Sequence, residues 1–160
     1  MSITIRPASE ADIPALAAIW NPIIRDTTII FSDEEKTPDD IAAMIASRPA
    51  FLVAEVEGTV AGLATYGQFR PSNGYRAAME HTVLIAPEAK ARGLGRALMA
   101  AIEADAKGRG FHVMLGVVSH ENAAGIAFHR AVGYRETGRL TETGQKFGRW
   151  LDAVVLQKIL

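Results

Sequence analysis

Apolar residues follow two different spacings along the chain, and these spacings predict its strands and helices. Short apolar or alternating runs predict strands at 3–6, 51–56, 59–69, 80–86, 113–118, 134–140 and 150–158. Helical spacing predicts a helix from about 12 to about 20 and three more at 37–48, 93–107 and 122–132. This order of elements predicts an α/β fold in which a mixed sheet carries helices on both faces.

Local start and stop signals set the expected boundaries. Ser9 with Asp12 resembles a capping box, and Thr37 followed by a proline and two acids starts the second helix. Pro22 is expected to end the first helix, since proline lacks the backbone N–H that a helix interior uses. Glu57-Gly58 predicts a hairpin, and the polar stretch 141–148 is expected to be a loop between the two closing strands.

Length and composition limit the classes of protein that fit. The 160 residues suit one domain spanning 1–160, with 49% hydrophobic and 22% charged residues. The absence of cysteine excludes disulfides, thiol nucleophiles and cysteine-bound zinc. A formal net charge of −1 argues against nucleic-acid binding over the whole surface. No apolar run is long enough for a membrane span, so a soluble, cytoplasmic protein is expected.

The stretch 80–98 carries the strongest chemical signal, because a strand runs into Gly93-Leu94-Gly95 at the start of a helix. Glycines there let backbone N–H groups approach an anion, and the helix N-terminus adds partial positive charge. Lys90, Arg92 and Arg96 flank the turn, which favours a phosphate or pyrophosphate. The alternative is that the glycines only make a tight turn.

Two motifs identify the phosphate ligand by resemblance. Leu98 stands where a dinucleotide fingerprint needs its third glycine, and no P-loop motif is present. Lys90-x-x-Gly93-x-Gly95 instead resembles the pyrophosphate motif Arg/Gln-x-x-Gly-x-Gly/Ala of the GNAT acyl-CoA N-acyltransferases. The segment Asn122-Ala-Ala-Gly-Ile-Ala-Phe-His129-Arg-Ala-Val-Gly133-Tyr134 is similar to the second signature of that superfamily. The resemblance implies about seven strands, four helices and acetyl-CoA as cosubstrate.

Further segments resemble the phosphinothricin/methionine sulfoximine N-acetyltransferase branch over nearly the whole chain. They are Trp20-Asn21, 27–31, Arg70, 74–76, 80–83 and 144–152. Leu84-Ile85 departs from the Tyr-Val usual in the branch. The resemblance implies acetylation of the α-amino group of phosphinothricin, methionine sulfoximine or methionine sulfone. It also implies a homodimer, to which 144–150 and the last strand would contribute.

The same resemblance implies roles for individual residues. Cofactor contacts fall on Val83, Leu84, Ile85, Ala91, Arg92, Gly93, Leu94, Gly95, Arg96 and Asn122. Substrate contacts fall on Phe31, Arg70, Asn73, Gly74, Tyr75 and Arg76, with arginine suited to bidentate recognition of a carboxylate or phosphinate.

Two side chains are candidate catalytic groups. Glu80 on the strand before the phosphate turn is the candidate base, and His129 is the candidate acid or a member of a water relay. The alternatives are a surface glutamate and a core histidine. The four histidines show no metal-ligand spacing, so no metal is expected. An acetyltransferase for another small amine or a protein N-terminus, and an inactive CoA-binding module, remain as rival functions.

Overall fold

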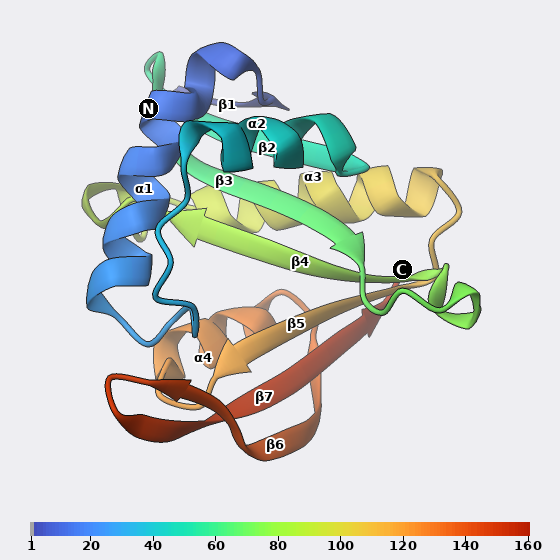
Figure 1. Cartoon of the computed structure of the whole chain (residues 1–160). Helices are drawn as coiled ribbons and strands as arrows, with labels where there is room; N and C mark the ends of the chain where they lie inside the picture. The colour runs from blue at the N-terminus through green and yellow to red at the C-terminus, as the bar shows by residue number, and fades with distance from the viewer. Residues whose placement is uncertain (1) are drawn as a thin grey trace.

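A computed structural model describes residues 2–160 and contains one seven-stranded mixed sheet in the order β1-β2-β3-β4-β5-β7-β6 (Figure 1). The strands are β1 (Ile3–Pro7), β2 (Ala50–Val56), β3 (Thr59–Gln68), β4 (Ala78–Ile85), β5 (Val113–Ser119), β6 (Arg135–Lys146) and β7 (Arg149–Ile159). All neighbours pair antiparallel except β4 and β5, which run parallel. The predicted α/β class is confirmed.

Four α-helices cover the two faces of the sheet, as expected. They are α1 (Ile13–Asp26), α2 (Pro38–Ser47), α3 (Leu94–Gly108) and α4 (Ala123–Ala131). In Figure 1, α1 and α2 lie in front of the sheet and α3 and α4 lie behind it. Within the part of the chain that the structure describes, no helix has both the length and the apolar character needed to span a membrane.

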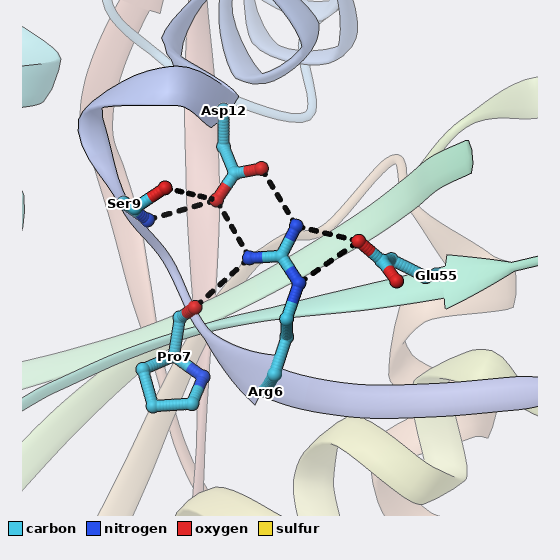
Figure 2. A network of polar contacts seen from close by, with 5 residues as sticks. All are labelled: Arg6, Pro7, Ser9, Asp12 and Glu55. Atoms are coloured by element: carbon cyan, nitrogen blue, oxygen red, sulfur yellow. Dashed lines mark hydrogen bonds and ion pairs between the residues drawn. The ribbon is translucent and has the colours of Figure 1, made fainter. Parts of the chain in front are cut away.

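The core consists of aliphatic side chains from α1, α3 and the central strands, with Leu16, Leu63, Leu98 and Ile102 fully buried. A polar network ties β1 to its surroundings (Figure 2). Arg6 donates to both carboxylate oxygens of Asp12 at 2.8 Å and to Glu55 at 2.5–2.8 Å. The guanidinium lowers the pKa of Asp12 to about 2. Asp12 also accepts from the backbone N–H of Ser9, which confirms the expected capping box.

The first helix does not end at Pro22, so that prediction was wrong. α1 continues through Pro22 to Asp26 and buries Ile24 on the face that carries Leu16 and Trp20. A proline inside a helix costs about 3 kcal/mol. Burial of one large aliphatic side chain recovers about 1.5–3 kcal/mol, so the apolar stripe offsets most of this cost.

The stretch 141–148 is also not a loop, because β6 and β7 form a hairpin that extends to Lys146 and Arg149. Only Phe147 and Gly148 form the turn, both with positive φ (55° and 73°), as the tightest hairpin turns require. A register shift between Leu140 and Gly144 interrupts the pairing. The polar sequence hid this strand because β6 lies at the exposed edge of the sheet.

The feature that positions the site is the short pairing between β4 and β5. The two strands pair only at residues 78–80 of β4, ending with Glu80 opposite Leu115. β4 then continues beside β3 as far as Ile85, while β5 continues beside β7 as far as Ser119. The sheet therefore opens after Glu80, and among residues 2–160 no strand pairs with the β5-facing edge of β4 from His81 onward.

Candidate functional site

A cavity of about 260 Å³ lies where β4 and β5 separate. Its walls come from the second half of each strand, from the segment after α1 and from α4. It is lined by Ile29, Ile30, Phe31, Glu80, His81, Thr82, Val83, Leu84, Gly116, Val117, Val118, Ser119, Asn122 and His129. The structure thus brings together six residues predicted for the site, namely Phe31, Glu80, Val83, Leu84, Asn122 and His129.

Glu80 lies between this cavity and a second one. The second cavity, of about 550 Å³, is lined by Ser47, Arg48, Pro49, Gly67, Gln68, Glu80 and Thr82. Burial raises the pKa of the Glu80 carboxyl, and the positive charge of Arg48 opposes that rise. Glu80 is therefore a half-buried carboxylate that borders both cavities, and its environment makes it a better proton acceptor than an exposed glutamate.

His129 is buried and pairs with a second histidine that was not predicted to be part of the site. The Nε2 atoms of His81 and His129 are 2.9 Å apart, and the two rings are stacked with their centroids 5.1 Å apart. His129 Nδ1 lies 2.6 Å from the carbonyl oxygen of Gly125. Both rings lie over Gly116, where a Cβ atom would be 3.0 Å from each of them.

These contacts determine the protonation of the pair. A carbonyl oxygen only accepts, so His129 Nδ1 carries a proton and donates it to Gly125. With both rings neutral, His129 Nε2 accepts the Nε2–H of His81, and the lone pair of His81 Nδ1 remains without a partner among residues 2–160. Burial lowers the pKa of both histidines, which is consistent with a neutral pair at pH 7.

The turn before α3 has the geometry expected of an anion site. Gly93 is the N-cap residue with φ +81°, and the first helical hydrogen bond runs from Ala97 N–H to Gly93 O. The backbone N–H groups of residues 94–96 therefore have no partner within the described chain. Lys90, Arg92 and Arg96 are exposed around this turn.

The other residues predicted to contact the cofactor differ in which backbone or side-chain groups are available for binding. Leu94 is buried in the core, so it can present only its backbone. Gly95 packs against the Phe128 ring, where a Cβ atom would come within 3.1 Å. Asn122 caps α4 by accepting from Gly125 N–H at 2.9 Å, which leaves its amide NH₂ for another partner. Ala91 is exposed with φ 64°, and Ile85 is half-buried beside Gly62.

Five predicted substrate residues lie in an exposed loop that lines neither cavity. A short 3₁₀ helix spans Asn73–Tyr75, and Arg76 donates to the carbonyl oxygen of Asn73 at 3.0 Å. Arg70 lies over the Tyr75 ring, 5.6 Å from its centroid, and Gly74 is exposed between them. The contacts of this loop are internal, so its role in substrate binding stays a prediction.

The segment that carries Phe31 is fastened by the β6–β7 hairpin. The buried Lys146 ammonium donates to the carbonyl oxygens of Ile24, at 2.5 Å, and Ile30, at 2.7 Å. Gly144 lies against the Phe31 ring, where a Cβ atom would come within 2.3 Å. Lys146 and Gly144 therefore fix one wall of the first cavity.

Three side chains at the site were not singled out from the sequence. His81 directly follows Glu80, Lys146 lies in the stretch expected to be a loop, and Arg48 marks the expected end of a helix. The sequence shows only that a basic residue, Arg48, stands directly before Pro49 at the end of a helix. Which residues surround its side chain depends on how β3 and β4 pair. Among residues 2–160, no group of three or more His, Asp or Glu could hold a metal ion.

Comparison with known proteins agrees with this architecture. The family model for the acetyltransferase (GNAT) family matches residues 16–134. An L-methionine sulfoximine/L-methionine sulfone acetyltransferase from Pseudomonas aeruginosa is 38% identical, over 98% of this chain and 94% of the relative. These matches confirm the resemblance to this family and branch.

Solved structures give the same result. A ribosomal-protein-alanine N-acetyltransferase from Brucella melitensis is 42% identical with a TM-score of 0.94, over 98% of this chain and 99% of that one. The structure of yncA from Salmonella typhimurium with its cofactor acetyl-CoA is 35% identical with a TM-score of 0.95, over 100% and 95%. Together with the opened sheet and the glycine turn, these matches show that the chain belongs to the GNAT family of acetyltransferases.

Proposed function

We propose that this acetyltransferase transfers the acetyl group of acetyl-CoA to the α-amino group of a small amino-acid analogue such as methionine sulfoximine, methionine sulfone or phosphinothricin. The observation that carries the proposal is the position of Glu80, a half-buried carboxylate that borders both cavities. One cavity can take the thioester and the other the amine, so that the two reactants meet beside a base. The Pseudomonas relative, which is named for methionine sulfoximine and methionine sulfone, supports this choice of acceptor.

The chain has groups that fit acetyl-CoA, which supplies the acetyl thioester when bound. The free N–H groups at the start of α3, with Lys90, Arg92 and Arg96 around them, suit a pyrophosphate. Val83, Leu84 and Ile85 lie on the part of β4 that has left β5, so their backbone groups can pair with an extended pantetheine arm. Asn122 offers its side-chain NH₂ to the same arm.

Proton transfer is assigned to Glu80 and His129. Glu80, directly or through a water molecule, takes a proton from the α-ammonium so that the amine can attack the thioester carbonyl. The ammonium nitrogen gives up two protons in all, one before the attack and one as the amide forms. The departing sulfur takes up one of them, and Glu80 passes the other to solvent, so one proton is released per turnover. His129 is assigned as the acid on the sulfur side or as a member of a water relay. In the neutral pair its Nδ1–H is donated to Gly125 and its Nε2 accepts from His81, so the acid role requires the pair to have taken up one further proton.

We also propose that the active form is a cytoplasmic homodimer of a single-domain chain. Leu140, Phe147 and Trp150 are large apolar side chains that are 49%, 56% and 59% exposed on the β6–β7 hairpin. Large apolar side chains exposed on one hairpin favour a protein–protein contact. The same hairpin fixes the Phe31 wall, so a second copy there would also stabilise the cavity.

The test is release of free CoA from acetyl-CoA with a panel of acceptors. The panel contains the three analogues, ordinary amino acids, small amines, and a peptide that begins with alanine. The peptide is included because the Brucella structure is a ribosomal-protein-alanine N-acetyltransferase. We expect the analogues to have the highest kcat/KM and the product to carry acetyl on the α-nitrogen. Preference for the peptide would refute the proposed acceptor, and no turnover of any amine would refute the enzyme assignment.

Two variants separate the catalytic roles. Glu80→Gln should lower kcat at pH 7 by about 10²–10⁴-fold, the usual contribution of a positioned acid or base. High pH should partly restore this variant, because more of the amine is then already neutral. His129→Phe should lower kcat without that rescue if His129 is the acid, whereas rescue of both variants would place His129 in the base relay. Wild-type kcat in both variants would contradict both assignments.

A further inference from the structure

Arg48 occupies a position that no role described so far explains. It is the C-cap residue of α2, directly before Pro49 and β2, and its side chain is half-buried in the wall of the second cavity. The guanidinium lies on Gly67 of β3, where a Cβ atom would come within 3.0 Å of Nη1. Gly67 is paired with Glu80 across β3 and β4, so Arg48 and Glu80 lie on the same face of the sheet.

The Arg48 guanidinium makes no ion pair or hydrogen bond with the part of the chain that the structure describes. Within residues 2–160, no carboxylate lies within ion-pair distance of Arg48, and no side-chain or backbone oxygen accepts a hydrogen bond from it. Arg6 provides the contrast, since Asp12 and Glu55 bind most of its donors (Figure 2). A half-buried arginine with its donors unused favours an anion in the cavity it borders.

The two charged groups of the cavity match the two charges of an amino acid. The carboxylate of Glu80 suits the ammonium group, and the planar fork of Arg48 suits a carboxylate. The charge of Arg48 lowers the pKa of Glu80, so the two groups influence each other across the same space. Gly67 leaves the guanidinium room, because any larger residue there would push it away.

We propose that Arg48 binds the α-carboxylate of the acceptor in the second cavity while Glu80 faces its amine. This inference rests on the proposed function and specifies how its substrate class is recognised. Arg48 then selects free amino acids over amines that lack a carboxylate. The far end of the acceptor, with its sulfoximine, sulfone or phosphinate group, points away from Arg48 and is read by other residues.

The experiment compares methionine sulfone with its α-carboxamide, which keeps the amine and the side chain but lacks the negative charge. Wild-type protein should prefer the acid. Arg48→Gln should lower kcat/KM for the acid by about 30-fold or more, the loss typical of a desolvated charged partner, and should change the value for the amide little. Arg48→Lys should recover part of the loss because it restores the charge without the fork. The KM for acetyl-CoA should not change.

Arg135→Gln is the matched control, since Arg135 is exposed on β6 and lines neither cavity. Arg76→Gln tests the other arginine predicted to bind a carboxylate. Thermal unfolding of each variant shows whether it folds. An equal fall for acid and amide in Arg48→Gln, or no fall, would overturn the proposal, as would a loss of acid preference in Arg76→Gln alone. If wild-type protein turns over no free amino acid, the proposed function fails together with this inference. If wild-type protein acetylates free amino acids and the Arg48 variants do so with the same kcat/KM, the inference alone fails.

Discussion

The buried histidine pair makes the folding stability depend on pH, and replacing one ring measures this dependence. In the folded protein His81 is 6% exposed, its Nε2 lies 2.9 Å from Nε2 of His129, and its ring packs against the edge of Tyr134. Burial lowers the pKa of His81, so the ring stays neutral while an unfolded chain would take up a proton. His81→Gln removes the titrating group, and its amide can still donate to His129 Nε2.

The magnitude follows from proton linkage. An unfolded histidine titrates near pH 6.5, whereas the buried ring does not, so the unfolded state binds more protons below that pH. Stability is therefore full above about pH 6.5 and falls as the pH is lowered. If His81 stays neutral down to pH 5, its contribution to this fall between pH 7 and pH 5 is about 2 kcal/mol. The variant should lose about 2 kcal/mol less than wild type over this interval.

Urea unfolding at pH 7, 6 and 5, followed by far-ultraviolet circular dichroism, gives the free energy of unfolding at each pH. Only the change with pH is compared, so any cost of the substitution at pH 7 cancels. His112→Gln is the control, since His112 is exposed, and it should keep the wild-type dependence. Parallel curves for wild type and His81→Gln would show that His81 is not a buried neutral group in the native state.

Two further predictions concern the glycine turn before α3 and the segment that carries Phe31. Gly93→Val should raise the KM for acetyl-CoA, because a branched residue is strained at φ +81° and would distort the turn that presents the free N–H groups. The control Gly108→Ala, in the last turn of α3, should leave that KM unchanged. Lys146→Met should lower the free energy of unfolding by about 1–3 kcal/mol, because one buried and one partly buried carbonyl oxygen lose their donor. Backbone hydrogen exchange should become faster in residues 27–32 of this variant. The control Lys107→Met, at an exposed position, should change neither the free energy of unfolding nor the exchange rate. Unchanged exchange in Lys146→Met would show that the lysine does not hold this segment.

Sequence patterns predicted the elements whose signals are local. The glycine turn before α3, the Thr37 cap and the Glu57-Gly58 hairpin each depend on residues within a few positions of one another, and all three are present. The two errors, at Pro22 and at 141–148, arise where a distant contact overrides a local signal. Burial of Ile24 carries the helix past its proline, and pairing with β7 orders a polar strand.

The site was predictable in part for the same reason. Glu80 and His129 could be proposed because each lies in a motif with a recognisable spacing. The pairing of His129 with His81 could not, because 48 residues separate them and only the packing of α4 on β5 brings the rings together. Arg48 and Glu80 likewise belong to different elements, and only the register of β3 and β4 places them on one face.

Alternation along β4 gives the site its two sides. Consecutive strand residues point to opposite faces, so Glu80 faces Arg48 at the end of α2 while His81 faces His129 on α4. Helix α3 begins at the glycine turn and lies on the same face of the sheet as α4 (Figure 1). Acetyl-CoA held at that turn would therefore approach from the α3–α4 face, and an amine held by Arg48 would approach from the other. They can meet only where the sheet is open, and it opens directly after Glu80. The end of the β4–β5 pairing therefore decides which carboxylate of the chain can serve as the base.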